Sequence, residues 1–422
     1  MRLALAVTSI ALLSAPAGGS GAENRADAPN LPVIRISVEM VQLDAVVTDK
    51  QGRPVTDLLP ADFEIRQDGQ PQQISLLSYV KVGAPGTPTR SMPSEGAAAT
   101  GQPASVAAAK TPPRTIVFVV DDLSLSLPSF DRTRRALTRA LDGLDPADRV
   151  AIVTTARGVK DLAPSTNRAE LRDAVASMRL APWTRAELTP LLSSQSWLFD
   201  VDGGSLEDWN IRFALQSVAI VKQVIKSLQP LPGRKALLLV SEGFAELDSL
   251  RRGSNVHDIY WPLDRLYGDA DDALAAWKRL GDFAMRGGVV IDAIDPRGLE
   301  TGGINADASV PNSNAPGRLA AIGRSQRAYL YDSQDSLKYL TDATGGLAML
   351  DRNDMSGAVS SILADLSGYY LIGYEPAKGT FGGKSFHTID IKVKRPSLKV
   401  RTRQGFYAVT DEQVAAALPK KQ

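Results

Sequence analysis

The sequence predicts an α/β fold: a doubly wound, mostly parallel sheet, with a smaller β-sandwich-like domain formed by segments near the two ends of the chain. Two observations support this prediction. Between residues 114 and 366, short apolar runs alternate with longer segments of helical periodicity, which is typical of a parallel sheet covered by helices on both faces. On either side, in residues 31–83 and 367–410, strand-like runs follow one another without helices between them.

The expected strands of the central α/β domain, residues 114–366, are short runs rich in Val, Ile and Leu, as strands buried on both faces require. They are 116–120, 150–154, 236–240, 289–294 and 347–350. The periodicity of the intervening segments favours helices. These are expected at 131–143, 167–178, 207–228, 270–286, 334–343 and 354–366. In such sheets ligands bind beyond the carboxyl ends of the strands, so the residues that follow each strand are the candidates for function.

The N-terminal β domain, residues 31–83, is expected to need a partner. The Asp68-Gly69 pair favours a hairpin turn, and a change in the phase of alternation near Met40 indicates a bulge. A unit of about 50 residues buries too little surface to be stable alone. We therefore expect it to pack against the C-terminal β segment, residues 367–410, in one sandwich. Residues 84–113, rich in Gly, Pro, Ala and Ser, are expected to be a linker.

Residues 1–22 are typical of a secretory signal peptide. Arg2 precedes an apolar run, residues 3–13, and small residues follow it. No later segment approaches the ~18 apolar residues of a membrane span. The sequence contains no cysteine, which excludes disulfides and thiolate metal sites. We therefore expect an exported protein, periplasmic or secreted, without a transmembrane anchor in its mature chain.

The charge balance argues against a nucleic-acid partner. Lys and Arg number 48, and Asp and Glu number 47, so the chain has no strong net field to attract phosphates. Basic residues gather in residues 384–403, but they alternate with apolar ones, as on the solvated face of a sheet. We expect no nucleic acid among the partners.

A cluster of oxygen-bearing side chains follows the expected strand 116–120. Asp122, Ser124 and Ser126 are spaced by two, so a carboxylate and two hydroxyls can converge on one point. Hard oxygen ligands of this kind suit a small divalent cation such as Mg²⁺. The alternative is that Asp122 or Ser124 caps the helix that follows, since Asp and Ser are favoured cap residues.

This strand and the cluster after it resemble the metal-ion-dependent adhesion site of the von Willebrand factor A domain. Residues 148–153 and 233–243 resemble further strands of the same fold. Most of residues 37–407 also resembles a bacterial family of exported VWFA-related proteins. The segments that carry this second resemblance are 46–49, 52–57, 62–63, 68–69, 295–298, 344–346, 353–354, 369–374 and 400–405.

The resemblance implies which residues hold the ion. Ser124 and Ser126 would coordinate Mg²⁺ directly, and Asp122 would approach it through water. Glu242, in Ser241-Glu242-Gly243, stands where the adhesion site has an aspartate; it keeps the charge but has a longer side chain. Mn²⁺ and Ca²⁺ are the other candidate ions.

The resemblance also implies a third hydroxyl ligand, normally a threonine that follows two glycines and precedes a helix. Gly203-Gly204-Ser205 is the nearest equivalent, so Ser205 is the expected ligand. Thr184 and Thr189 are alternatives, because the segment 181–205 is longer than the resemblance predicts.

In the adhesion domains that the chain resembles, an acidic residue of a protein partner fills the open position on the ion. The resemblance therefore implies a protein-binding module rather than an enzyme. Two alternatives stay open: an envelope or secreted scaffold with a vestigial metal site, and a hydrolase that uses His257. The sequence has two histidines and neither a Gly-x-Ser-x-Gly nor a His-Glu-x-x-His motif, which argues against the hydrolase.

Overall fold

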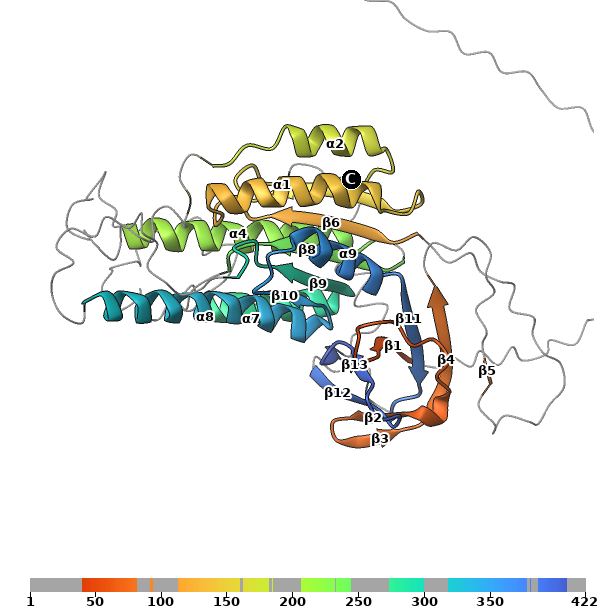
Figure 1. The fold of residues 1–422 in the computed structure, drawn as a ribbon. Helices are drawn as coiled ribbons and strands as arrows, with labels where there is room; N and C mark the ends of the chain where they lie inside the picture. The colour runs from red at the N-terminus through yellow and green to blue at the C-terminus, as the bar shows by residue number, and fades with distance from the viewer. Residues whose placement is uncertain are drawn as a thin grey trace, which may run out of the picture. The chain divides into compact units, whose positions relative to one another are not determined.

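The computed structural model describes residues 40–81, 92–93, 113–159, 162–181, 184, 206–231, 233–243, 273–299, 318–377, 380 and 386–407. They belong to one compact unit, Glu39–Gln422. Within them the fold is mixed α/β, with a five-stranded parallel sheet and two antiparallel sheets (Figure 1). No helix in this part of the chain is long and apolar enough to span a membrane. The expected signal peptide and most of the expected linker lie outside the described residues.

The parallel sheet has the strand order β10-β9-β8-β6-β7, and every neighbouring pair is parallel. Its strands are β6 (Thr115–Val120), β7 (Arg149–Thr154), β8 (Lys235–Val240), β9 (Val289–Ile294) and β10 (Ala348–Met349). They lie where the sequence predicts strands. Strand β6 is buried over its whole length, because apolar cores cover both of its faces.

Helices pack on both faces of this sheet, and Figure 1 shows α1 and α2 on one side with α7 and α8 on the other. The helices that the structure describes are α1 (Leu127–Asp142), α2 (Arg168–Ala176), α4 (Leu206–Leu228), α7 (Ala273–Arg286), α8 (Arg318–Thr344) and α9 (Met355–Asp365). Phe118 and Val120 pack in one core with α1, α2 and α9. Val117 and Val119 pack in the other with α4, α7 and α8. The alternation of side chains along β6 therefore divides the α/β region into two cores.

Helix α8 is longer than the sequence predicts. It begins at Arg318, whereas the expected helix covers only 334–343. Gly323 and Ser325 interrupt the apolar periodicity of the earlier residues. The Ala, Leu, Arg and Gln residues around them are strong helix formers, and the helix continues through the interruption.

The connections that follow β6 and β8 run in opposite directions along the sheet, from β6 to β7 on one side and from β8 to β9 on the other. Strand β7, the next in sequence, pairs with one edge of β6, and β8 pairs with the other. The strand order therefore reverses between β6 and β8, and a crevice at such a reversal is where open α/β sheets bind ligands. The residues that follow these two strands, 121–126 and 241–243, include four of the predicted metal ligands.

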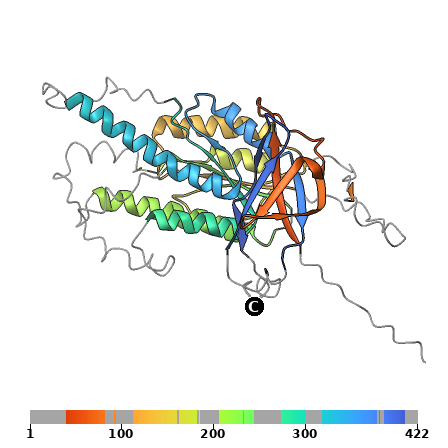
Figure 2. The same ribbon diagram turned by 90° about the horizontal axis from the view of Figure 1, so that it is seen from below.

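Both antiparallel sheets combine strands from near the two ends of the chain (Figure 2). One sheet has the order β13-β1-β11-β4-β5 and the other β14-β12-β2-β3. The strands are β1 (Val41–Thr48), β2 (Phe63–Gln67), β3 (Gln70–Gln72), β4 (Ile74–Lys81), β5 (Met92–Pro93), β11 (Gly368–Tyr374), β12 (Phe386–Val393), β13 (Lys399–Arg401) and β14 (Gly405–Tyr407). Leu43, Ile65, Tyr370 and Ile389 share one core. Each end segment supplies part of this core, whereas the boundaries of the expected domains stay a prediction.

The Asp68-Gly69 turn joins β2 to β3. Both residues have positive φ angles, 50° and 79°, as the favoured two-residue hairpin turns require. His387, on β12, places its Nδ1 atom 2.7 Å from Asp68 Oδ2, so this histidine supports the turn. The bulge expected near Met40 involves residues outside the described part of the chain.

Asp292, in the middle of β9, is expected to make stability depend on pH. It is fully buried, and desolvation raises its pKa to about 7 although the Leu347 N–H bonds its carboxylate. Asp365 raises this pKa further, while Arg234 and Arg401 lower it. Below about pH 4, the ordinary pKa of an aspartate, the Asp292 carboxyl is protonated in both the native and the unfolded state. Between pH 4 and 7 only the unfolded state releases its proton, so stability falls by up to about 1.4 kcal/mol per pH unit.

Asp292→Asn removes this titration. Urea unfolding at pH 5, 6, 7 and 8 should show the variant gaining stability relative to wild type as the pH rises to 7, with no further gain above it. Asp342→Asn, an exposed change on α8, is the control and should leave the pH dependence unchanged. Parallel curves for Asp292→Asn and wild type would show that Asp292 ionises normally.

Candidate metal centre

The loops that follow β6 and β8 meet through the predicted ligands. Ser124 Oγ lies 3.2 Å from Ser241 Oγ, and the backbone N–H of Glu242 donates to Ser124 Oγ over 3.2 Å. The backbone N–H and the hydroxyl of Ser126 both donate to Glu242 Oε1, each over 2.9 Å. Residues 116 positions apart in sequence are thus joined where β6 and β8 end.

Ser126 also begins helix α1. Its Oγ accepts a hydrogen bond from the backbone N–H of Ser129 over 3.4 Å, and its backbone is extended, as in an N-cap. The alternative that Asp122 or Ser124 caps this helix is therefore wrong. The cap falls on the third residue of the cluster, which leaves the Asp122 and Ser124 side chains to make other contacts.

Asp122 has one satisfied and one unsatisfied carboxylate oxygen. Its Oδ1 accepts from the backbone N–H of Ala156 over 2.8 Å and lies 3.1 Å from Thr155 Oγ1. Its Oδ2 is buried and has no hydrogen-bond partner in the described part of the chain. The residue is 1 % exposed, and this burial raises its pKa. A bound cation would offset the cost of keeping such a carboxylate ionised.

Asp121 joins the ends of β6, β7 and β8 to α4, a role that its neighbours in sequence do not indicate. Its fully buried carboxylate lies 2.9 Å from Thr155 Oγ1, 2.5 Å from Ser217 Oγ and 2.7 Å from Ser241 Oγ. The three hydroxyls come from the end of β7, from α4 and from the end of β8. Strand alternation places Asp121 on the same face of the sheet as Val119, which is the face that α4 covers. The hydroxyl residues directly after β7 and β8, Thr155 and Ser241, could also have indicated its partners.

Gly243 fixes the path of the loop after β8. Its φ angle is 76°, and a Cβ atom added there would lie 1.9 Å from the backbone oxygen of Ser333 on α8. Only glycine fits this close approach. Ser333 is itself held by Arg297, whose guanidinium donates to Ser333 Oγ over 2.9 Å and pairs with Asp295 after β9.

The structure leaves the third hydroxyl ligand undecided. Ser205 and Thr189 lie outside the described residues. Thr184 is described and is fully buried. His257, on which a hydrolase would depend, also lies outside the described residues.

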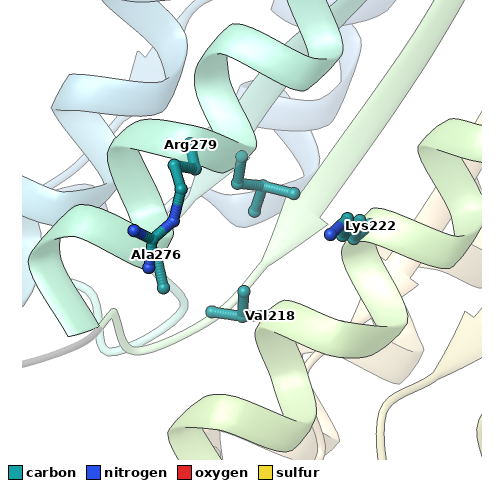
Figure 3. Close-up of a pocket in the computed structure, with 5 residues that line it drawn as sticks. Val218, Lys222, Ala276 and Arg279 are labelled. Carbon is teal, nitrogen blue, oxygen red and sulfur yellow. The ribbon is translucent and has the colours of Figure 1, made fainter. Parts of the chain in front are cut away.

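Two hollows elsewhere involve none of the predicted ligands. A hollow of about 40 Å³ lies between α4 and α7 (Figure 3). It is lined by Val218, Lys222, Ala276, Arg279 and Leu280. The second, of about 290 Å³, lies in the β domain beside Leu77, Tyr79 and Tyr370.

Comparison with known proteins adds little to this geometry. No protein-family model matches the chain, and no curated protein matches its sequence. Among solved structures, the chain is similar to the crystal structure of the human COPII-coat protein Sec24c. The identity is 10 %, the match covers 71 % of this chain and 44 % of that chain, and the TM-score is 0.29. The chain thus spans less than half of Sec24c, and the likeness is too distant to bear on function.

The donor set nonetheless fits a hard divalent cation. Among the described residues, no three His, Cys, Asp or Glu side chains gather as a metal-binding group. The predicted set is of another kind, with two carboxylates, Asp122 and Glu242, and hydroxyls between them. Ser124 Oγ donates to the backbone oxygen of Asp121 over 2.9 Å, and Ser126 Oγ donates to Glu242. Each of these hydroxyls also accepts one backbone N–H, Ser124 from Glu242 and Ser126 from Ser129. Because a hydroxyl oxygen has two lone pairs, each keeps one for a cation.

Proposed function

We propose that this protein is an exported binding module whose crevice between β6 and β8 holds Mg²⁺ and uses it to engage an acidic residue of a protein partner. The proposal includes membership of the bacterial VWFA-related family, on the strength of the motifs in its sequence. The observation that carries it is Asp122 Oδ2, a buried carboxylate oxygen without a partner in the described part of the chain. It belongs to the same short loop as Ser124 and Ser126.

Each residue has a distinct part in the proposed site. Ser124 and Ser126 supply hydroxyl oxygens, and Asp122 supplies negative charge. Glu242 supplies a second carboxylate, and its Oε1 accepts hydrogen bonds from the backbone N–H and the hydroxyl of Ser126. A ligand set with so few charges leaves a cation electron-poor and open to a further carboxylate, which is why a partner's Asp or Glu suits it.

Isothermal titration with Mg²⁺ and Mn²⁺ tests the proposal. Wild type should bind one ion, and Ser124→Ala should bind it about tenfold more weakly or worse, because a ligand is lost. Ser361→Ala, which removes an exposed hydroxyl on α9, is the matched control and should bind like wild type. Failure of both ions to bind wild type would rule out a metal-dependent function.

A scaffold with a vestigial site is the second candidate. The observation that favours it is that Ser124, Ser126 and Glu242 satisfy one another by hydrogen bonds. Pull-downs from envelope and culture fractions, with and without chelator, separate the two. The binding module should lose its partner on chelation and in Ser124→Ala, whereas a scaffold should retain the same partners throughout.

A further inference from the structure

Arg132 lies beside the proposed metal centre. It sits on α1, and its Nη2 atom is 3.5 Å from Ser129 Oγ, which in turn is 2.9 Å from Ser126 Oγ. The Ser129 hydroxyl therefore links the guanidinium to a predicted metal ligand.

The guanidinium has no carboxylate partner among the described residues, and its Nε atom is buried without a hydrogen-bond partner there. Among the described residues, Arg114 pairs with Asp148 and Arg297 with Asp295. Arg234, like Arg132, has side-chain nitrogens without a hydrogen-bond partner there, but it lies over the Tyr369 ring and not beside the predicted ligands. Arginine is suited to planar recognition of carboxylates through its fork of donors. Arg132 is thus a cation beside the crevice with unused capacity for an anion.

The loop after β9 closes over this arginine. Gly298 has a φ angle of 83°, and a Cβ atom there would lie 3.2 Å from Arg132 Nη1 and 2.7 Å from Asn353 Oδ1. The glycine therefore allows the loop to approach the guanidinium closely. Asn353 holds the loop in place, because its Oδ1 accepts a 2.9 Å hydrogen bond from the backbone N–H of Leu299. The guanidinium of Arg132 therefore lies between Ser129 on its own helix and Gly298 in this loop.

Two exposed leucines accompany these groups. Leu127 directly follows Ser126 and is 57 % exposed, and Leu299 directly follows Gly298 and is 60 % exposed. Large apolar side chains this exposed contribute to partner contacts when they surround a polar anchor. Arg132 thus has an exposed leucine on its own helix, Leu127, and another beside Gly298 in the loop that approaches it.

We infer that this surface receives an acidic side chain with apolar neighbours, and that Arg132 binds one oxygen of its carboxylate while the other oxygen faces the ion site at Ser126. The inference rests on the proposed function and names the partner: an acidic, apolar peptide segment. Arg132 selects for a carboxylate because a neutral amide cannot replace the charge. Leu127 and Leu299 bind the apolar residues on either side of it.

A peptide titration of the Mn²⁺-loaded protein tests this inference. The probe is N-acetyl-Leu-Asp-Leu-amide, and the readouts are water-proton relaxation of the bound Mn²⁺ and the Mn²⁺ affinity itself. Wild type should bind the Asp peptide and should not bind the same peptide with Asn. Arg132→Gln should weaken peptide binding about tenfold and leave Mn²⁺ affinity within twofold of wild type. Arg132→Lys keeps the positive charge but loses the forked donors of the guanidinium, so its affinity for the peptide should lie between those of wild type and Arg132→Gln.

Arg139→Gln is the matched control, since Arg139 is exposed on the same helix and donates to Ser356. It should bind peptide and ion like wild type. Equal peptide affinity in Arg132→Gln and wild type would overturn the role of Arg132 while the metal site stands. If wild type fails to bind Mn²⁺, the proposed function fails and this inference fails with it. Circular dichroism of each variant confirms that it is folded.

Discussion

Replacing Asp121 by alanine is expected to lower the free energy of unfolding by about 3–5 kcal/mol and to abolish Mg²⁺ binding. The Asp121 carboxylate is the common acceptor for Thr155, Ser217 and Ser241. Hydrogen bonds to a charged group contribute about 1.5–3 kcal/mol each, and a buried donor without an acceptor costs about 1–3 kcal/mol. The three hydroxyls can turn toward other acceptors, so the loss of stability is expected to be smaller than the sum of the three hydrogen-bond energies. Ser241 then no longer positions Ser124.

Urea unfolding and Mg²⁺ titration measure the two effects. Asp121→Asn keeps the shape without the charge and should fall between wild type and Asp121→Ala. Asp131→Ala, at a half-exposed position on α1 where the carboxylate pairs with Arg134, should change stability by no more than about 0.5 kcal/mol. A loss below about 1 kcal/mol in Asp121→Ala would mean that Asp121 does not hold the three elements together.

Replacing Gly243 by alanine is the second large effect expected. The positive φ angle costs an alanine about 1 kcal/mol, and the new Cβ atom would lie 1.9 Å from the Ser333 backbone oxygen. Because that oxygen belongs to a helix, the loop rather than the helix must move. We expect a loss of about 3 kcal/mol in stability, and a loss of Mg²⁺ affinity because Ser241 and Glu242 move with the loop.

Gly52→Ala separates the two costs. Gly52 has nearly the same φ angle, 78°, and a Cβ atom there would meet nothing within 4 Å. It should therefore show only the conformational penalty and bind Mg²⁺ normally. If Gly243→Ala and Gly52→Ala lower the free energy of unfolding equally, the close approach to Ser333 does not contribute to the cost of the Gly243 substitution.

The strands of the parallel sheet were predictable because each is a short, mainly apolar run, and such runs have few alternatives when they are buried on both faces. Strand β9 could be predicted although Asp292 interrupts its apolar run. The cluster at Asp122, Ser124 and Ser126 was predictable for the same reason, since it directly follows β6. Helix α8 was only partly predictable, because its first half has helix propensity without an apolar stripe.

The role of Asp121 was not predictable from its neighbours in sequence. Its partners Ser217 and Ser241 lie 96 and 120 residues further along the chain, and only the packing of α4 and β8 against β6 brings them to it. The contact between Glu242 and Ser126 depends in the same way on the strand order. Local pattern gives the candidates, and tertiary packing decides which of them touch.

The place of β11 in the antiparallel sheet has a consequence for how the chain matures. Strand β11 lies between β1 and β4 and pairs with both, yet it begins at Gly368 whereas β4 ends at Lys81. Until residues 368–374 have been synthesised, β1 and β4 have no central strand, and their open edges can pair with other chains. The core that these strands share is therefore completed only after the α/β region between them has been synthesised, and the growing chain needs protection from aggregation until then.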